Sequence, residues 1–287
     1  MSDEGSVRVS VLLPVRNGEP FLRKQLEALE RQSCSFPWEV IVIDNGSTDG
    51  SGATAKEFET RLPNFQLLWE GIAGKSRALN LGIAAARGRH LVFVDSDDEA
   101  QEGYVEKMSE ALEEFDVVGA CIDTTTLNPW WASREMATNE AVPVYRNFRQ
   151  ALPGCVVAMR ATVCEQVGPY DVNLMSAEDI DYTWRAAGLG AKFGRQLDAV
   201  MRVRRSPRSR DAFKKSRSYG RSHVWLYQRY RSEGMPRRSW RGVVGPVRSM
   251  VVRALRREES WTWGIAWELG TLVGHAEESI RCGVFYP

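Results

Sequence analysis

The chain has no long apolar run, few cysteines and almost no net charge. Its longest weakly charged stretch, 260–275, contains Glu268 and is shorter than the roughly 20 apolar residues that a membrane-spanning helix requires. The five cysteines are scattered singly without a CxxC pair, which excludes a disulfide framework and favours reduced thiols. The polar, acidic start MSDEGSVRVS lacks the basic flank and apolar centre of a signal peptide. We therefore expect a cytoplasmic protein with no transmembrane segment.

Charge is distributed unevenly along the 287 residues. Thirty-eight Lys and Arg against thirty-seven Asp and Glu give a net charge of +1. Between Arg202 and Arg281, however, nineteen basic residues stand against seven acidic ones, so the remainder of the chain is acidic. With 43% hydrophobic and 26% charged residues, the composition is that of a folded protein with a real core. The basic part, which is interleaved with aromatic residues, indicates an anionic partner or surface.

Short apolar runs alternate with helical patterns through the first two hundred residues. This alternation predicts an α/β fold, with a mostly parallel sheet flanked by helices. The apolar runs predict strands at 7–15, 39–43, 65–69, 90–94, 117–122 and 156–159, and the helical patterns fall at 21–32, 76–86, 102–114 and 177–187.

The character of the chain changes beyond Arg205. The segment 206–210 (SPRSR) breaks regular structure, and the residues after it have helical patterns rich in arginine and aromatic side chains. We therefore divide the chain into a catalytic domain at 1–205 and a basic, aromatic-rich helical region at 206–287.

Polar residues follow three of the predicted strands. In α/β sheets ligands bind beyond the carboxyl ends of the strands, so these residues are expected at one rim. Asp95 and Asp97 alternate at the end of an apolar strand, where a turn can place both carboxylates on one side. Such oxygen ligands suit Mg²⁺ or Mn²⁺, which often binds a diphosphate at the same time. Taken alone, the cluster could equally be a turn or a helix cap.

Four segments resemble the ordered motifs of glycosyltransferase family 2: VSVLLPVRNGE, VIDNGSTDG, FVDSDD and GPYDVNLMSAEDIDYTWRAAGLG. The resemblance covers roughly residues 7–205. It implies the GT-A fold and an enzyme that transfers a sugar from a nucleotide diphosphate donor to an acceptor hydroxyl with inversion. It also implies Mn²⁺ or Mg²⁺ as cofactor. A UDP-sugar is the donor class that we expect, and the acceptor is a glycan, a lipid-linked sugar or a small molecule.

The resemblance also assigns roles by position. Asp97, with Asp95, matches the metal-binding DXD motif, and Asp98 is expected to support it. The family often has a second Asp where this chain has Asn45, so that side chain lacks the charge. Lys75 and Arg77 match a stretch that approaches the donor phosphates, although a solvated helix start is the simpler alternative. The positions implied for nucleotide-sugar binding are Pro14, Val15, Arg16, Asp44, Asn45, Lys75, Arg77, Asn80, Asp95 and Ser96.

Glu178 and Asp179 match the ED motif of the family. The resemblance implies that Asp179 is the general base, and Glu178 is expected to orient the acceptor. A carboxylate suits this role because it need only accept the hydroxyl proton as the new bond forms. The alternative is that these acidic residues merely favour the positive end of a helix.

Two other functions compete with this interpretation. A sugar-phosphate nucleotidyltransferase has a similar sheet but usually a glycine-rich, basic first loop, whereas 14–18 is poor in glycine. A protein that binds nucleic acid or another anionic surface would account for the basic, aromatic C-terminal region. We expect no nucleic-acid partner.

Clustered cations beside Trp261, Trp263 and Trp267 would instead permit peripheral contact with an anionic membrane at its inner face. Packing on the catalytic domain or on a second copy in a homodimer is the remaining alternative.

Overall fold

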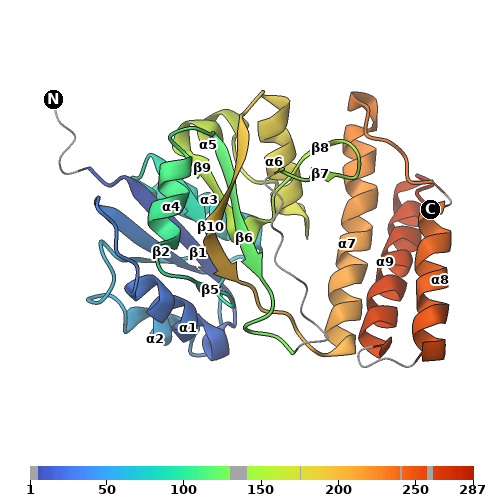
Figure 1. Cartoon of the computed structure of the whole chain (residues 1–287), viewed down its shortest axis with the longest axis horizontal. Helices are drawn as coiled ribbons and strands as arrows, with labels where there is room; N and C mark the ends of the chain where they lie inside the picture. Colours follow the sequence, from blue (N-terminus) through green and yellow to red (C-terminus); the bar gives the residue numbers. More distant parts are fainter. Residues whose placement is uncertain (1–5, 130–140, 175, 240, 257–260) are drawn as a thin grey trace.

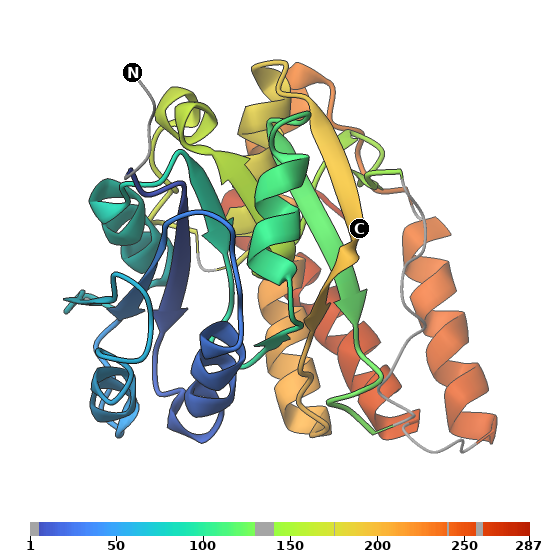
Figure 2. The same cartoon turned by 60° about the vertical axis from the view of Figure 1, so that its left-hand side comes forward.

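The computed structural model describes residues 6–129, 141–174, 176–239, 241–256 and 261–287. An eight-stranded mixed sheet carries helices on both faces, and three C-terminal helices stand beside it (Figure 1, Figure 2). The strand order is β3-β2-β1-β4-β9-β6-β10-β5. The predicted α/β fold with a helical C-terminal extension is therefore confirmed.

The first half of the sheet is parallel. β1 pairs with β2 and β4, and β2 pairs with β3, each in the parallel sense. All four strands were predicted, as were the helices that follow β1 and β3. The elements are β1 (Val9–Val15), α1 (Glu19–Glu30), β2 (Trp38–Asp44), α2 (Ser51–Lys56), β3 (Gln66–Trp69), α3 (Lys75–Ala85) and β4 (His90–Phe93).

The second half mixes strand directions. β9 runs antiparallel to both β4 and β6, whereas β10 is parallel to β6 and antiparallel to β5. The elements are β5 (Glu99–Ala100), α4 (Tyr104–Ala111), β6 (Val117–Asp123), β7 (Val144–Tyr145), β8 (Arg149–Gln150), β9 (Val157–Arg160), α5 (Ala161–Val167), α6 (Glu178–Gly188) and β10 (Phe193–Arg202). The small β7–β8 hairpin lies outside the main sheet.

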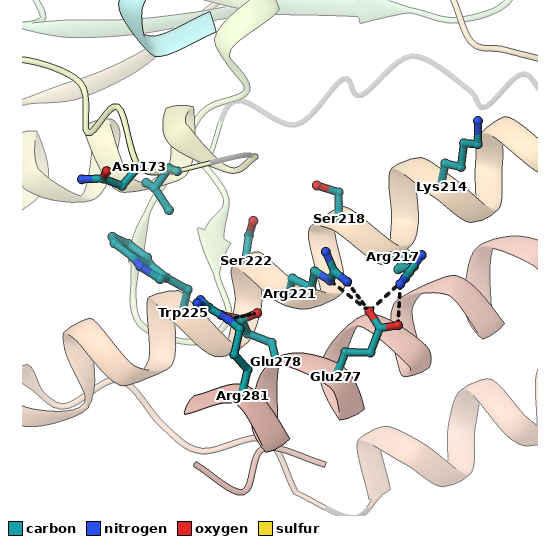
Figure 3. Close-up of a pocket in the computed structure, with 11 residues that line it drawn as sticks. Asn173, Lys214, Arg217, Ser218, Arg221, Ser222, Trp225, Glu277, Glu278 and Arg281 are labelled. Carbon is teal, nitrogen blue, oxygen red and sulfur yellow. Dashed lines mark hydrogen bonds and ion pairs between the residues drawn. The ribbon is translucent and has the colours of Figure 1, made fainter. Parts of the chain in front are cut away.

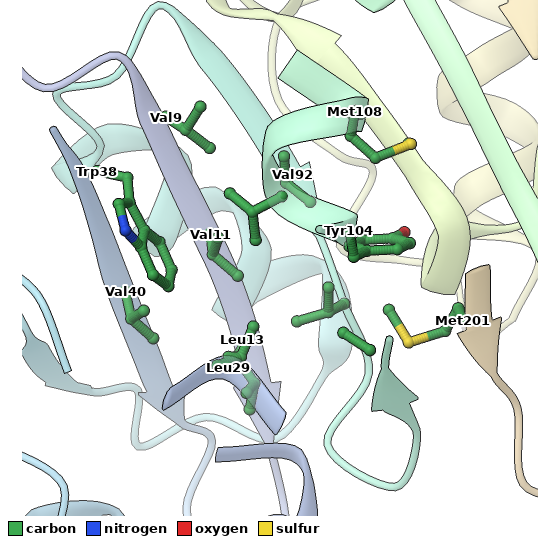
Figure 4. Packing of buried hydrophobic residues seen from close by; sticks show 14 of the residues in the cluster. Val9, Val11, Leu13, Leu29, Trp38, Val40, Val92, Tyr104, Met108 and Met201 are labelled. Carbon is green, nitrogen blue, oxygen red and sulfur yellow. The ribbon is translucent and has the colours of Figure 1, made fainter. Parts of the chain in front are cut away.

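Side chains of the central strands alternate between two cores. Val9, Val11 and Leu13 of β1 pack with α1, α2 and α4 on one face (Figure 4). Leu12 and Ile41 face the opposite side, where α3, α5 and α6 cover the sheet. Burial on both faces explains why these strands are nearly continuous apolar runs in the sequence.

α7 (Ser209–Tyr230) connects the three C-terminal helices to the sheet unit. α7 and α9 (Trp261–Cys282) lie against each other, and α8 (Arg241–Arg256) packs on α9. Leu226 and Tyr230 of α7 join a cluster around the fully buried Trp184 of α6. None of the helices in the described ranges has both the length and the apolar character needed to span a bilayer.

Glycine makes the close contact between α7 and α9 possible. A Cβ atom at Gly220 would lie 2.3 Å from the carbonyl oxygen of Thr271, and one at Gly274 would lie 2.1 Å from that of Arg217. Any larger side chain at either position would therefore push the two helices apart.

Candidate active site

A cleft of about 520 Å³ opens between the ends of β1 and β4 on one side and the start of α6 on the other. It brings together the two acidic clusters that the sequence motifs mark, one after β4 and one at the start of α6. The charged residues of its lining are Arg16, Lys75, Asp95, Asp97, Asp98, Glu178, Asp179, Arg204 and Lys215.

The first cluster follows β4. Lys75 Nζ donates to Asp95 Oδ1 at 2.5 Å, so an ammonium group already sits against one carboxylate. Asp98 is 2% exposed, and its Oδ1 accepts a hydrogen bond from Arg204 N at 2.9 Å. Ligand atoms of Asp95, Asp98 and Cys155 all lie within 4.8 Å of one another. The structure thus groups Asp98 with Asp95, while Asp97 lines the same cleft with an exposed side chain.

The electrostatics of this cluster favour an added cation. The carboxyl groups of Asp97 and Asp98 are both partly desolvated by the protein atoms around the cleft, although Asp97 stays open to solvent on one side. This desolvation, and then the charge of Asp95, raises the pKa of both Asp97 and Asp98. Burial alone would lower the pKa of Lys75, but Asp95 and the acidic residues across the cleft outweigh it and raise that pKa. Carboxylate oxygens are suitable ligands for Mg²⁺ or Mn²⁺, so the residues present fit such an ion. Burial raises the pKa of the Cys155 thiol, which keeps this soft donor protonated.

The second cluster opens α6. Asp179 Oδ2 accepts a hydrogen bond from Gly154 N at 2.8 Å, and its Oδ1 accepts one from Ile180 N at 2.8 Å. These two bonds fix the carboxylate and leave each oxygen a lone pair for a further donor. Burial, followed by the charge of Asp179, raises the pKa of Glu178 to about 7. The arrangement can accept a proton from a hydroxyl group that enters the cleft.

The end of β2 and the loop after it hold two residues that were predicted to contact the donor. Asp44 is 7% exposed, and its Oδ1 accepts a hydrogen bond from Ser47 N at 2.9 Å. Asn45 uses its whole amide: Nδ2 donates to two carbonyls of the loop 70–72, and Oδ1 accepts from Gly74 N at 2.7 Å. We therefore assign Asn45 to holding this loop against β2. Neither residue is part of the cleft lining.

Of the residues predicted at the end of β1, Arg16 lines the cleft, whereas Pro14 and Val15 are buried in the strand. Val15 O accepts a hydrogen bond from Asn45 N at 2.8 Å. These two residues shape the rim through the backbone.

Three more predicted donor-binding residues, Arg77, Asn80 and Ser96, also lie outside the cleft lining. Asn80 is fully engaged with Tyr170, because its Nδ2 donates to the Tyr170 carbonyl at 3.0 Å and its Oδ1 accepts from Tyr170 N at 2.8 Å. This pair ties α3 to the segment that leads into α6.

Sequence reasoning missed the part of the cleft that α7 provides. Lys215, Ser218 and Tyr219 line it, although they fall beyond the expected domain boundary. It also missed Gly154, whose N–H holds Asp179. The only signal for α7 was its mixture of cations and aromatic residues, which does not indicate where the helix docks.

Comparison with known proteins agrees with this architecture. Residues 10–164 match the family described as "Glycosyl transferase family 2". Glycosyltransferase AglE of Haloferax volcanii is 31% identical over 190 residues, which is 63% of this chain and 62% of the relative. The chain therefore spans less than two thirds of that relative's length.

Two solved structures are similar over nearly the whole chain. S. aureus TarS 1-349 in complex with UDP-GlcNAc has a TM-score of 0.57 at 20% identity, covering 98% of this chain and 93% of that one. Mannosyltransferase PcManGT from Pyrobaculum calidifontis, in complex with GDP-Man and Mn²⁺, has a TM-score of 0.62 at 16% identity, covering 96% and 89%. At these identities the likeness establishes the fold.

The sheet, its helices and the similar structures define a protein of the GT-A fold. The family match covers more than half of the chain, and the chain therefore belongs to glycosyltransferase family 2.

Proposed function

We propose that the protein is an inverting glycosyltransferase that moves a sugar from a nucleotide diphosphate donor to an acceptor hydroxyl. One observation carries the proposal: a single cleft holds Asp95 and Asp97 on one flank and Asp179 on the other. Displacement at an anomeric carbon needs a stabilised leaving group on one face and a base on the opposite face. Two acidic flanks of one cleft meet both requirements.

Asp95 and Asp97 are the residues that would hold Mn²⁺ or Mg²⁺, with Asp98 behind them. When bound, such an ion stabilises the negative charge that develops on the departing nucleotide diphosphate. Arg16 and Lys215 line the same cleft and bring further positive charge to the phosphates.

Asp179 acts as the general base in this proposal. The N–H groups of Gly154 and Ile180 orient its carboxylate, which then accepts the proton of the acceptor hydroxyl as that oxygen attacks the anomeric carbon. Glu178 stands beside it and orients the acceptor. A single displacement inverts the configuration.

We favour a UDP-sugar as donor. The TarS structure holds UDP-GlcNAc and the PcManGT structure holds GDP-Man, so both bases occur on this fold. Thermal unfolding of the purified chain with UDP-GlcNAc, UDP-glucose or GDP-mannose, with and without Mn²⁺, tests donor class and metal together. We expect a UDP-sugar to raise the melting temperature only when Mn²⁺ is present.

The same screen separates the competing functions. Salt-dependent stabilisation by single-stranded oligonucleotides, with indifference to Mn²⁺, would overturn the proposal in favour of a protein that binds anionic polymers. Formation of a nucleotide-sugar from a nucleoside triphosphate and a sugar phosphate would instead identify a nucleotidyltransferase.

The outer face of α8 supports a second proposal, peripheral contact with an anionic membrane. Its apolar residues Val244, Val247, Val251 and Leu255 are 44% to 80% exposed, and Arg248 and Arg253 line a neighbouring hollow. An exposed apolar stripe beside arginines is typical of helices that lie in a bilayer interface. We expect flotation with vesicles of phosphatidylcholine and phosphatidylglycerol but not of phosphatidylcholine alone. Binding that survives Val251→Asp together with Leu255→Asp would exclude this face.

A further inference from the structure

A second hollow, of about 550 Å³, shares lining residues with the candidate active site. Figure 3 shows the side chains that line it. Its floor is one stripe of α7, where Lys214, Arg217, Arg221 and Trp225 follow each other at helical spacing. We call this hollow the α7–α9 groove, because Glu277, Glu278 and Arg281 of α9 form its other side. At 1.5 Å per residue, the stripe from Lys214 to Trp225 is about 16 Å long, enough for several sugar units.

The α7–α9 groove joins the active-site cleft. Leu174 and Ser218 line both hollows. At the junction Ser218 Oγ donates to Ser176 Oγ at 3.0 Å, and Ser176 is a further residue of the cleft lining. A chain-like molecule could therefore place one end at Asp179 and extend along α7.

The groove carries excess positive charge. Four cations line it together with two carboxylates, Glu277 and Glu278. Glu277 is shared between Arg217, at 2.6 Å, and Arg221, at 2.7 Å, as Figure 3 shows. Both arginines bind it through Nε and Nη2, which leaves Nη1 of each without a hydrogen-bond partner in the described part of the chain. Lys214 is exposed and forms no ion pair with any of the described residues.

The far end of the groove is aromatic. Trp225 is a partly exposed residue, and the guanidinium of Arg229 lies over its ring at 5.0 Å from the ring centroid. Aromatic rings offer apolar area for the C–H faces of sugars, while arginines bind carboxylate or phosphate through paired N–H groups. The groove therefore combines the two kinds of contact that a sugar chain with anionic substituents would use.

We propose that the α7–α9 groove binds the acceptor and that the acceptor is an acidic oligosaccharide, bearing carboxylate or phosphate groups. This inference rests on the proposed glycosyltransferase function. The sugar whose hydroxyl reacts lies at the Ser218 junction, the anionic groups meet Lys214, Arg217 and Arg221, and a more distant sugar packs on Trp225.

Binding of defined oligosaccharides tests the proposal. Mannopentaose phosphate and neutral mannopentaose form a matched pair, and tetragalacturonate supplies carboxylates in place of phosphate. Titration calorimetry at low salt, with UDP and Mn²⁺ present and absent, should show tighter binding of one or both acidic probes than of mannopentaose. Preference between the two acidic probes identifies which anionic group the groove takes.

Three variants localise the binding. Lys214→Gln removes a cation that has no ion pair to lose. It should lower the affinity for the acidic probe about 2- to 5-fold, and high salt should abolish this difference. Trp225→Leu should lower the affinity for the acidic and the neutral probes alike. The triple change Arg217→Gln, Arg221→Gln and Glu277→Gln removes the ion-pair network as a unit, so no partner is left unpaired. Lys56→Gln, an exposed lysine on α2, is the matched control.

Equal affinity for mannopentaose and both acidic probes, or no binding of either acidic probe, would overturn the proposal. An affinity for the acidic probes that is the same in Lys214→Gln and in Lys56→Gln would also overturn it. Mn²⁺-dependent stabilisation by UDP-sugars, measured on the same preparations, reports the donor cleft separately. If UDP-sugars with Mn²⁺ do not stabilise the unmodified chain, the result counts against the glycosyltransferase function. If they do stabilise it but neither acidic probe binds, the result counts against the groove alone.

Discussion

Replacing Glu178 by glutamine should stabilise the metal-free protein at alkaline pH. Glu178 has a pKa raised from 4.5 to about 7, first by burial and then by the charge of Asp179. A raised pKa means that the protonated acid stabilises the fold fully below about pH 4.5 and that this contribution is lost as the pH rises through about 7. Glutamine does not ionise and avoids the loss.

The size of the effect follows from the pKa shift. At 1.36 kcal/mol per unit, the shift corresponds to about 3 kcal/mol, and the partial access of water to the cleft reduces this to about 1–3 kcal/mol. For a chain of this size, the melting temperature of Glu178→Gln should exceed that of the wild type by about 2–6 °C at pH 8. The two curves should converge near pH 4.5.

The measurement is differential scanning calorimetry in EDTA from pH 4.5 to pH 8. Glu59→Gln, a change of an exposed carboxylate on the surface, controls for the altered net charge. The reasoning about this carboxyl group would be refuted if the melting-temperature difference between Glu178→Gln and the wild type stayed constant with pH. A difference that grows towards acidic pH would refute it as well.

Three further predictions concern the reaction. Asp179→Asn should retain Mn²⁺-dependent donor stabilisation but lose transfer by about 10²- to 10⁴-fold; normal turnover would contradict its role as base. Asp97→Ala should abolish the stabilisation that a UDP-sugar gives with Mn²⁺, and an unchanged shift would remove Asp97 from the metal site. In Gly154→Ala the new Cβ would lie 3.1 Å from Asp179 Cβ, so donor turnover should fall about 10- to 100-fold with donor binding intact. Gly245→Ala is its control, because a Cβ there would meet no described group within 4 Å beyond the adjoining backbone of its own helix. Equal turnover of the two variants would show that Asp179 tolerates the displacement.

The predictable part of the fold is the part with strong local patterns. β1 and β2 are buried on both faces, so their apolar runs are nearly continuous and their bounds could be predicted to within two residues. β10 has a register shift between Gln196 and Val200, and polar residues interrupt its pattern. β5 has only two residues, and its pairing with the distant β10 leaves no local signal.

The same distinction applies to the site. Asp95, Asp97, Glu178 and Asp179 were predicted together because ordered motifs mark them, and the structure brings them into one cleft. Motifs do not separate residues that line a cleft from residues that support it. Asn45 therefore could not be told from a ligand contact, since its hydrogen bonds to a loop some 25 to 29 residues away depend on the tertiary structure.

The contribution of α7 to the cleft has a consequence for how the protein can be cut and recombined. Lys215, Ser218 and Tyr219 close one side of the cavity, and two α7 serines hold Ser176 just ahead of α6. Truncation after residue 205 would therefore remove this wall and open the cleft to bulk water. Exchanging the last eighty residues with those of another family member would transplant that missing wall along with the helices.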